Sequence, residues 1–201
     1  MALSIQALKN HPDFIDLTDD EHMHFDLRYA TENNFMGENL YKNFTRCYLH
    51  REAAAKLRQA AAELQQSRPG WKLLIFDCLR PRSVQRKLFE FVRGTPQQPY
   101  VADPDQGSIH NYGFAVDLSL LDANSNELDM GTHFDSFDAL SEPRLEREHI
   151  RTGRLTTAQH ANRLILRKIM TAAGFIQLPN EWWHYDALPG HKVRAHYEIV
   201  E

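Results

Sequence analysis

The chain has 201 residues, a formal net charge of −4, 42% hydrophobic residues and 25% charged residues. A chain of this length and ordinary composition can bury a sizeable core, which excludes a disordered or fibrous protein and predicts a single domain over residues 1–201. The acidic balance argues against nucleic acid as a partner, and the short apolar runs argue against a membrane span. The sequence leaves the oligomeric state open.

The two cysteines, Cys47 and Cys78, lie far apart in the sequence and fit neither a CxxC motif nor a disulfide framework. We therefore expect two free thiols in a reducing cytosol, with Cys78 acting as a small buried hydrophobic residue. The first residues contain no apolar stretch behind positive charge, so we see no secretory signal and expect a cytoplasmic protein.

Hydrophobic periodicity and helix propensity predict the elements of the first half of the chain. Residues 24–30 alternate polar and apolar side chains, which favours a half-buried strand. Residues 51–66 consist of strong helix formers and stop before a Pro-Gly pair. Residues 71–76 form a short apolar run typical of a buried strand, and residues 83–92 repeat apolar side chains at helical spacing.

The second half contains one strong strand signal and one strong helix signal. Residues 113–121 alternate in polarity, and residues 128–130 are a candidate for the returning strand. Residues 156–173 form an amphipathic helix, and residues 175–178 and 182–185 a last pair of strands. Because these elements do not alternate as βαβ units, we expect an α+β fold with a mainly antiparallel sheet flanked by helices.

Candidate metal ligands concentrate in two segments, residues 108–117 and 181–186. His110, Asp117 and His184 would supply the three protein ligands that a catalytic zinc ion requires. Side chains seven positions apart point to opposite faces of a strand, so His110 and Asp117 converge only if the chain turns near Gly113. The structural alternatives are a hydrogen-bonded core histidine at position 184 and a turn-capping aspartate at position 117.

Glu181 precedes the candidate ligand His184 by three residues, so the two meet only if the chain bends near Glu181. Zinc would polarise a scissile carbonyl and lower the pKa of water to about 7. A carboxylate beside the metal, for which Glu181 is the candidate, would then move the proton from water to the leaving amine.

Five motifs occur in an order that resembles the zinc D-alanyl-D-alanine dipeptidases of the VanX type. The resemblance implies the fold shared with D,D-carboxypeptidases of the VanY type and the Hedgehog signalling domain, with a zinc site at the sheet. It covers about residues 13–186. The motifs are D-L-x-Y-A-T with NF-x-G at 26–37, D-x-x-R-P at 77–81, S-x-H-x-x-G-x-A-x-D at 108–117, DMG-x-x-FD at 129–135 and E-x-W-H at 181–184.

The resemblance also implies roles for individual residues. One zinc ion per chain would be held by His110, Asp117 and His184, and Glu181 would be the catalytic base.

Four further residues match positions around the substrate. Arg80 matches an arginine that stabilises the transition state, and its guanidinium can hold an oxyanion or a terminal carboxylate. The alternative for Arg80 is a salt bridge to Asp77. Ser108, Tyr29 and Asp135 match substrate-binding positions, with Asp135 suited to a substrate ammonium group.

The implied function is hydrolysis of D-alanyl-D-alanine or a similar small dipeptide in cell-wall (peptidoglycan) chemistry. The alternatives are a D,D-carboxypeptidase or endopeptidase acting on peptidoglycan stem peptides, and a zinc-containing binding module without catalysis. Departures from the family pattern, Leu79 before Arg80 and the pair Asn111-Tyr112, put the substrate preference in question.

Overall fold

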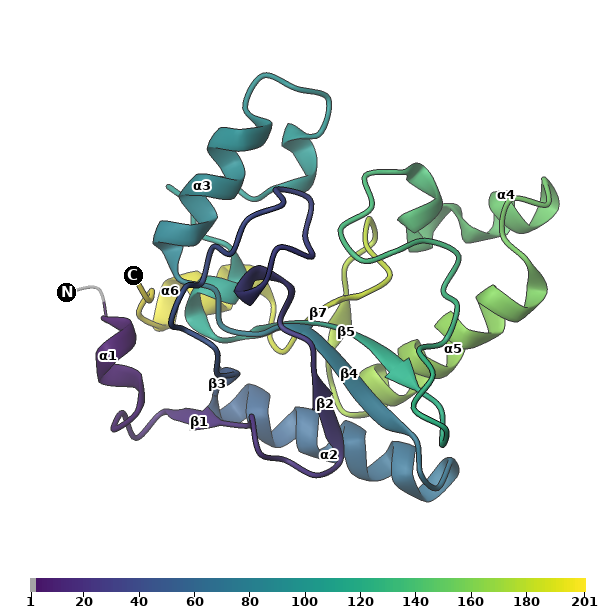
Figure 1. Cartoon of the computed structure of the whole chain (residues 1–201), viewed down its shortest axis with the longest axis horizontal. Helices are drawn as coiled ribbons and strands as arrows, with labels where there is room; N and C mark the ends of the chain where they lie inside the picture. The colour runs from purple at the N-terminus through teal and green to yellow at the C-terminus, as the bar shows by residue number, and fades with distance from the viewer. Residues whose placement is uncertain (1–2) are drawn as a thin grey trace.

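A five-stranded sheet in the order β2-β4-β5-β7-β6 forms the centre of the protein, in a computed structural model that describes residues 3–201 (Figure 1). Only β2 and β4 pair in parallel, and the other neighbours are antiparallel. The mainly antiparallel α+β fold is therefore confirmed. The strands are β2 (Met23–Phe25), β4 (Lys72–Asp77), β5 (Ala115–Leu121), β6 (Ile176–Gln177) and β7 (His184–Asp186). A second sheet pairs β1 (Phe14–Asp16) with β3 (Tyr48–His50).

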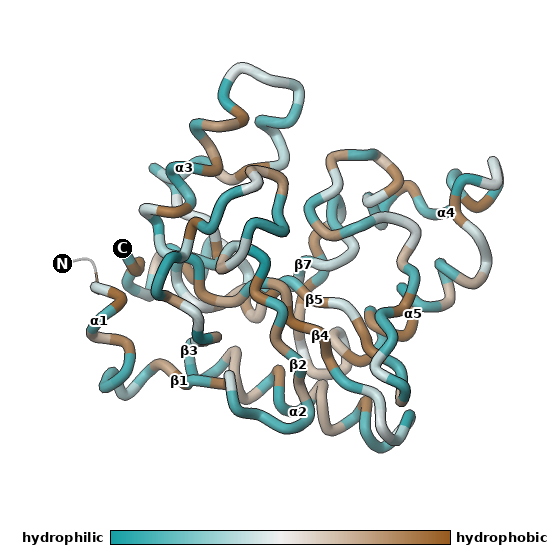
Figure 2. Tube along the Cα trace, in the orientation of Figure 1, coloured by the Kyte–Doolittle hydropathy of each residue, from teal (hydrophilic) through white to brown (hydrophobic). Residues whose placement is uncertain are grey.

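The two central strands are buried on both faces. All positions of β5 and all of β4 except Lys72 are inaccessible to solvent. Figure 2 shows hydrophobic residues gathered along these strands. Helices α2 (Arg51–Ser67) and α5 (Thr157–Ala172) pack against each other beneath the sheet (Figure 1). Loops and α3 (Arg82–Val92) lie on the opposite side of the sheet, which the two long helices do not cover.

The sequence predicted the long helices within one or two residues of their ends. Helix α2 turns its alanines and Leu57 into the core, and α5 begins with a capping box between Thr156 and Gln159. The remaining helices are short: α1 (Ile5–Leu8), α4 (Glu146–Arg151) and α6 (Gly190–His196). Within residues 3–201, no helix combines the length and the apolar character needed to cross a membrane.

Two predicted strands differ from the structure. The strand expected over residues 24–30 ends at Phe25, and a 3₁₀ turn, η1 (Arg28–Ala30), follows. The Tyr29 carbonyl there accepts hydrogen bonds from the amides of Leu40 and Tyr41, so the chain pairs with a loop and leaves the sheet. The returning strand expected over residues 128–130 is reduced to an isolated bridge between Glu127 and Leu121.

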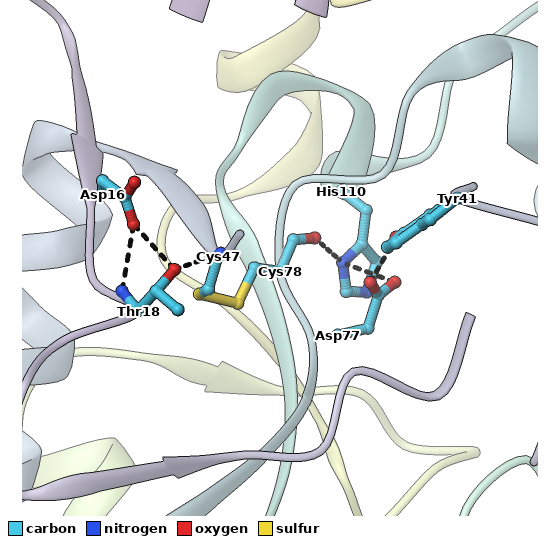
Figure 3. The surroundings of a disulfide bond; sticks show 7 residues. All are labelled: Asp16, Thr18, Tyr41, Cys47, Asp77, Cys78 and His110. Atoms are coloured by element: carbon cyan, nitrogen blue, oxygen red, sulfur yellow. Dashed lines mark hydrogen bonds and ion pairs between the residues drawn. A yellow bond between two sulfur atoms is a disulfide. The ribbon is translucent and has the colours of Figure 1, made fainter. Parts of the chain in front are cut away.

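Cys47 and Cys78 form a disulfide, so the expectation of two free thiols is wrong (Figure 3). Their Cα atoms are 5.5 Å apart, and the Leu79 amide donates to the Tyr48 carbonyl beside them at 3.0 Å. Both cysteines are buried, as expected for Cys78. Sequence spacing did not reveal the pairing because tertiary folding, rather than a local motif, brings the start of β3 to the end of β4. The prediction of a reducing compartment loses this support.

Reducing the disulfide should lower the free energy of unfolding by about 2–4 kcal/mol, because the bond closes a loop in the unfolded chain. The cysteines are separated by 31 positions. Urea unfolding with and without reductant measures the effect. The double variant Cys47→Ser/Cys78→Ser is the matched control and should not respond to reductant. An equal stability of the oxidised and reduced wild type would contradict the prediction.

Candidate active site

Three acidic or imidazole side chains lie in one row across the central strands. Asp117 on β5 is the register partner of His184 on β7 and of Asp77 on β4. An irregularity between Ile75 and Asp77 shifts the register of β4, so that Asp77 rather than Phe76 lies opposite Asp117. The side chains of directly paired residues on neighbouring strands are close enough to touch. The sheet therefore brings Asp77, Asp117 and His184 together although they lie far apart in the sequence.

His110 reaches this row from a tight turn that precedes β5. It belongs to a 3₁₀ helix, η3 (Ile109–Tyr112), which ends at Gly113 with φ of +71°. A Cβ atom on Gly113 would lie 2.9 Å from the His50 backbone nitrogen, so only glycine fits there. The turn that the spacing of His110 and Asp117 required is thus present.

The donor atoms of His110, Asp117 and His184 lie within 4.8 Å of one another, and all three residues are buried. His110 Nε2 is 3.2 Å from Asp117 Oδ2 and 3.2 Å from His184 Nδ1, and His184 Nδ1 is 2.9 Å from Asp117 Oδ1. Ligands about 2.1 Å from a tetrahedral zinc ion are roughly 3.4 Å apart. The nitrogen and oxygen donors present fit zinc in both chemistry and spacing.

The other ring nitrogen of each histidine has its own acceptor. His110 Nδ1 donates to the Cys78 carbonyl at 2.6 Å (Figure 3), and His184 Nε2 donates to Asp186 Oδ1 at 2.9 Å. Such partners fix the tautomer, so that the lone pairs of His110 Nε2 and His184 Nδ1 face each other. Sequence reasoning missed Asp186. Its position two residues after His184 in a strand, on the same face, was the available signal.

The carboxylates of Asp117 and Asp186 make this cluster a site for positive charge. Burial alone would raise the pKa of Asp117, yet His110 and His184 hold it well below its usual value. Burial likewise opposes charge on His184, but Asp186 and Asp117 raise its pKa well above the usual value. The cluster thus favours a bound cation, either protons or a metal ion.

Glu181 lies in the turn before β7, outside the set of three donors. Its side chain is 15% exposed, and its Oε2 atom is 3.9 Å from His184 Nδ1. Burial raises the pKa of Glu181 to about 7. A carboxylate with such a pKa can both accept and release a proton near neutral pH.

The Arg80 guanidinium is held on several sides. Nε donates to Asp77 at 2.9 Å, Nη1 to Gln85 at 3.0 Å, and Nη2 lies 3.4 Å from Asp117. The guanidinium also lies over the Tyr29 ring, 4.8 Å from its centroid. The salt bridge to Asp77, which the sequence offered as an alternative role, is therefore present beside the metal cluster. Gln85 is a second residue that sequence reasoning missed.

A cavity of about 330 Å³ connects these groups and has the size of a small-ligand site. It is lined by every predicted site residue: Tyr29, Arg80, Ser108, His110, Asp117, Asp135, Glu181 and His184. The Tyr29 hydroxyl donates to Asp135 Oδ2 at 2.7 Å. Burial raises the pKa of Asp135 well above its usual value. This carboxyl group therefore lacks a full positive partner in the ligand-free protein.

Aromatic side chains from three loops meet at the same cavity. The Phe137 ring lies 5.2 Å from Phe35 and 5.8 Å from Tyr100, centroid to centroid. The Tyr100 hydroxyl also donates to Glu142 at 3.0 Å. We call Phe35, Tyr100 and Phe137 the aromatic bridge, because their ring contacts link three segments that line the cavity.

Comparison with known proteins agrees with this geometry. Residues 13–200 match the family model described as D-ala-D-ala dipeptidase. The chain is 36% identical to the D-alanyl-D-alanine dipeptidase of Escherichia coli over 164 residues, which are 82% of this chain and 78% of that protein. It is 32% identical to the enzyme of that name from Streptomyces coelicolor, over 80% of this chain and 84% of the relative. For the Enterococcus faecalis enzyme the identity is 28%, over 83% of this chain and 88% of the relative.

Asp135→Asn should raise the free energy of unfolding at pH 7 by about 0.5–2 kcal/mol, a common gain when a functional-site conflict is removed. The pKa of Asp135 is raised in the folded protein, so the wild type loses stability as pH rises above the unfolded-state value of 3.8. Asparagine also tolerates the left-handed backbone, φ +59°, at this position.

Urea unfolding of both metal-free proteins at pH 5 and pH 8 tests this expectation. The advantage of the asparagine variant should grow with pH. A variant less stable than the wild type at pH 8 would contradict it.

Proposed function

The chain belongs to the D-ala-D-ala dipeptidase family, and from this premise we propose that it is a zinc-dependent enzyme that hydrolyses D-alanyl-D-alanine or a similar small dipeptide with free ends. The observation that carries the proposal is the cluster of His110, Asp117 and His184 with Glu181 beside it in one cavity. One zinc ion per chain would be held by His110 Nε2, His184 Nδ1 and an Asp117 carboxylate oxygen.

When bound, zinc supplies Lewis-acid chemistry, since it polarises a carbonyl and acidifies water. The proton is moved by Glu181. Its carboxylate accepts a proton from the water that attacks the scissile carbonyl carbon, and it delivers a proton to the amine nitrogen as the C–N bond breaks. A pKa of about 7 suits both steps.

Arg80 stabilises the negative charge that develops on the carbonyl oxygen during attack. Asp77 and Gln85 hold the guanidinium in place before substrate arrives, so little reorganisation is needed in the transition state. Asp135 and Tyr29 would bind the substrate ammonium group, which supplies the positive charge that Asp135 lacks.

The two alternatives are less well supported. A binding module without catalysis has no need of both Glu181 and Arg80 at the cavity. A D,D-carboxypeptidase must admit a longer peptide on the amino side, whereas the aromatic bridge joins the loops around this cavity.

We propose further that the physiological substrate comes from cell-wall peptidoglycan, the chemistry that the sequence motifs implied; the relatives' names specify the dipeptide D-alanyl-D-alanine. The cytoplasmic location predicted from the sequence stays a prediction, and the disulfide fits an oxidising environment better. Counting free thiols in protein trapped with an alkylating agent inside the producing cell would test it.

Replacing a ligand and replacing the base should have different consequences. His184→Ala should lose zinc and activity together, because two protein ligands remain. Glu181→Ala should keep about one zinc per chain while kcat falls by about 10²- to 10⁴-fold, the contribution of a positioned base. Metal analysis and steady-state kinetics with D-alanyl-D-alanine measure both effects. Full zinc occupancy in His184→Ala, or loss of metal in Glu181→Ala, would show the roles to be wrongly assigned.

Blocking the substrate's amino end should impair hydrolysis. N-acetyl-D-Ala-D-Ala has no ammonium group to pair with the Asp135 carboxylate, so it forgoes the charge-assisted contact that the free dipeptide makes. Asp135→Asn should therefore narrow the difference in kcat/KM between the free and the acetylated dipeptide. Equal hydrolysis of the two by the wild type would reject the dipeptidase and favour the carboxypeptidase.

A further inference from the structure

The carboxylate end of the substrate needs a positively charged partner, and Arg80 is already engaged. Its Nε, Nη1 and Nη2 atoms contact Asp77, Gln85 and Asp117, and the residue is only 8% exposed. The Arg80 guanidinium has five N–H groups, and most of them already donate to these partners, so too few remain for a two-point contact with a terminal carboxylate. Arg80 therefore suits the reacting carbonyl oxygen better than a terminal carboxylate.

A second arginine lines the same cavity. Arg194, on α6, donates from Nε and Nη2 to the Gly107 carbonyl at 3.1 and 3.0 Å, and from Nε to the Gln106 carbonyl at 3.1 Å. Among residues 3–201 its hydrogen bonds go only to backbone carbonyls, and no carboxylate forms an ion pair with it. Arg194 is exposed to solvent, and its positive charge lies at the cavity wall with Nη1 free of hydrogen bonds to the described residues.

Gly190 leaves the space that this guanidinium occupies. A Cβ atom at Gly190 would lie 2.9 Å from Arg194 Nη1, which is closer than real Cβ contacts allow. The backbone at Gly190 is not left-handed, so its conformation does not require glycine. A side chain at position 190 would instead displace the Arg194 guanidinium from its present place at the cavity, which Gly190 also lines.

Arg194 is tied to the chain directly before Ser108. The Gly107 carbonyl that it binds belongs to the peptide unit that leads into Ser108, so the guanidinium and the Ser108 hydroxyl flank the same part of the cavity wall. Asp135, which accepts a hydrogen bond from Tyr29, is one of the acidic residues of the lining. The cavity therefore carries charges of both signs, as a zwitterionic dipeptide requires.

We propose that Arg194, together with Ser108, binds the free carboxylate of the substrate, and that Arg80 is left to act on the reacting carbonyl. This inference rests on the proposed dipeptidase function. It makes Arg194 a specificity-determining residue that requires an unblocked carboxyl end.

Binding to a catalytically inactive parent tests the proposal. Zinc-loaded Glu181→Gln protein would be titrated calorimetrically with D-Ala-D-Ala and with its C-terminal amide, which lacks the negative charge. Arg194→Gln in this background should weaken binding of the free dipeptide by roughly 10- to 100-fold, the value of a charge-assisted hydrogen bond. It should change binding of the amide less than about threefold, because the amide presents no charge for Arg194 to pair with. Arg194→Lys should restore part of the loss.

Lys192→Ala is the matched control, since Lys192 is an exposed cation on the same helix and does not line the cavity. It should bind both ligands as the parent does. An equal loss for both ligands in Arg194→Gln would mean that Arg194 only supports the Gly107 backbone, and would overturn the proposal. No loss for either ligand, or no binding of the free dipeptide to the parent, would overturn it as well. Wild-type protein that binds but does not hydrolyse the dipeptide would instead refute the proposed function alone.

Discussion

The Asp117 carboxylate is the charge around which this molecule is organised. It lies on the fully buried central strand, where an isolated carboxylate is strongly unfavourable unless polar or charged partners surround it. His110, His184 and Arg80 meet this requirement from three directions, at 3.2, 2.9 and 3.4 Å. The sheet register places His184, the turn before β5 places His110, and the segment after β4 places Arg80. The active centre is thus part of the core and not an addition to its surface.

The four residues 77–80, at the end of β4 and directly after it, combine structural support with the proposed chemistry. Asp77 holds the Arg80 guanidinium, and the Cys78 carbonyl orients His110. The disulfide joins Cys78 to Cys47 and so fixes this segment against the segment that precedes β3 (Figure 3). The salt bridge and the catalytic role of Arg80, which the sequence presented as alternatives, are therefore compatible. Positioning residues of this kind let a site meet its transition state without reorganising.

The sequence predicted most of this arrangement where local rules were sufficient. Periodicity predicted the long helices and the central strands. The seven-residue separation of His110 and Asp117, which would place them on opposite faces of a strand, required the turn that ends at Gly113. The resemblance to the dipeptidases supplied the roles, which spacing alone left open. The disulfide, Gln85 and Asp186 were not predicted, because each acts through a tertiary contact that no local pattern specifies.

The distribution of charge explains how one cavity can select a small zwitterion. Asp135 has a raised pKa and only the Tyr29 hydroxyl as a partner, while Arg194 has only backbone carbonyls. The negative charge of Asp135 is therefore less favourable in the free protein than it would be beside a positive charge, whereas Arg194 is exposed to solvent. A dipeptide with free ends supplies both opposite charges at the spacing of one residue pair, whereas a blocked peptide lacks one of them and a longer peptide separates them further. In our proposal, selectivity follows because the buried Asp135 carboxyl group, which is unfavourable in the free protein, becomes favourable beside the substrate ammonium group.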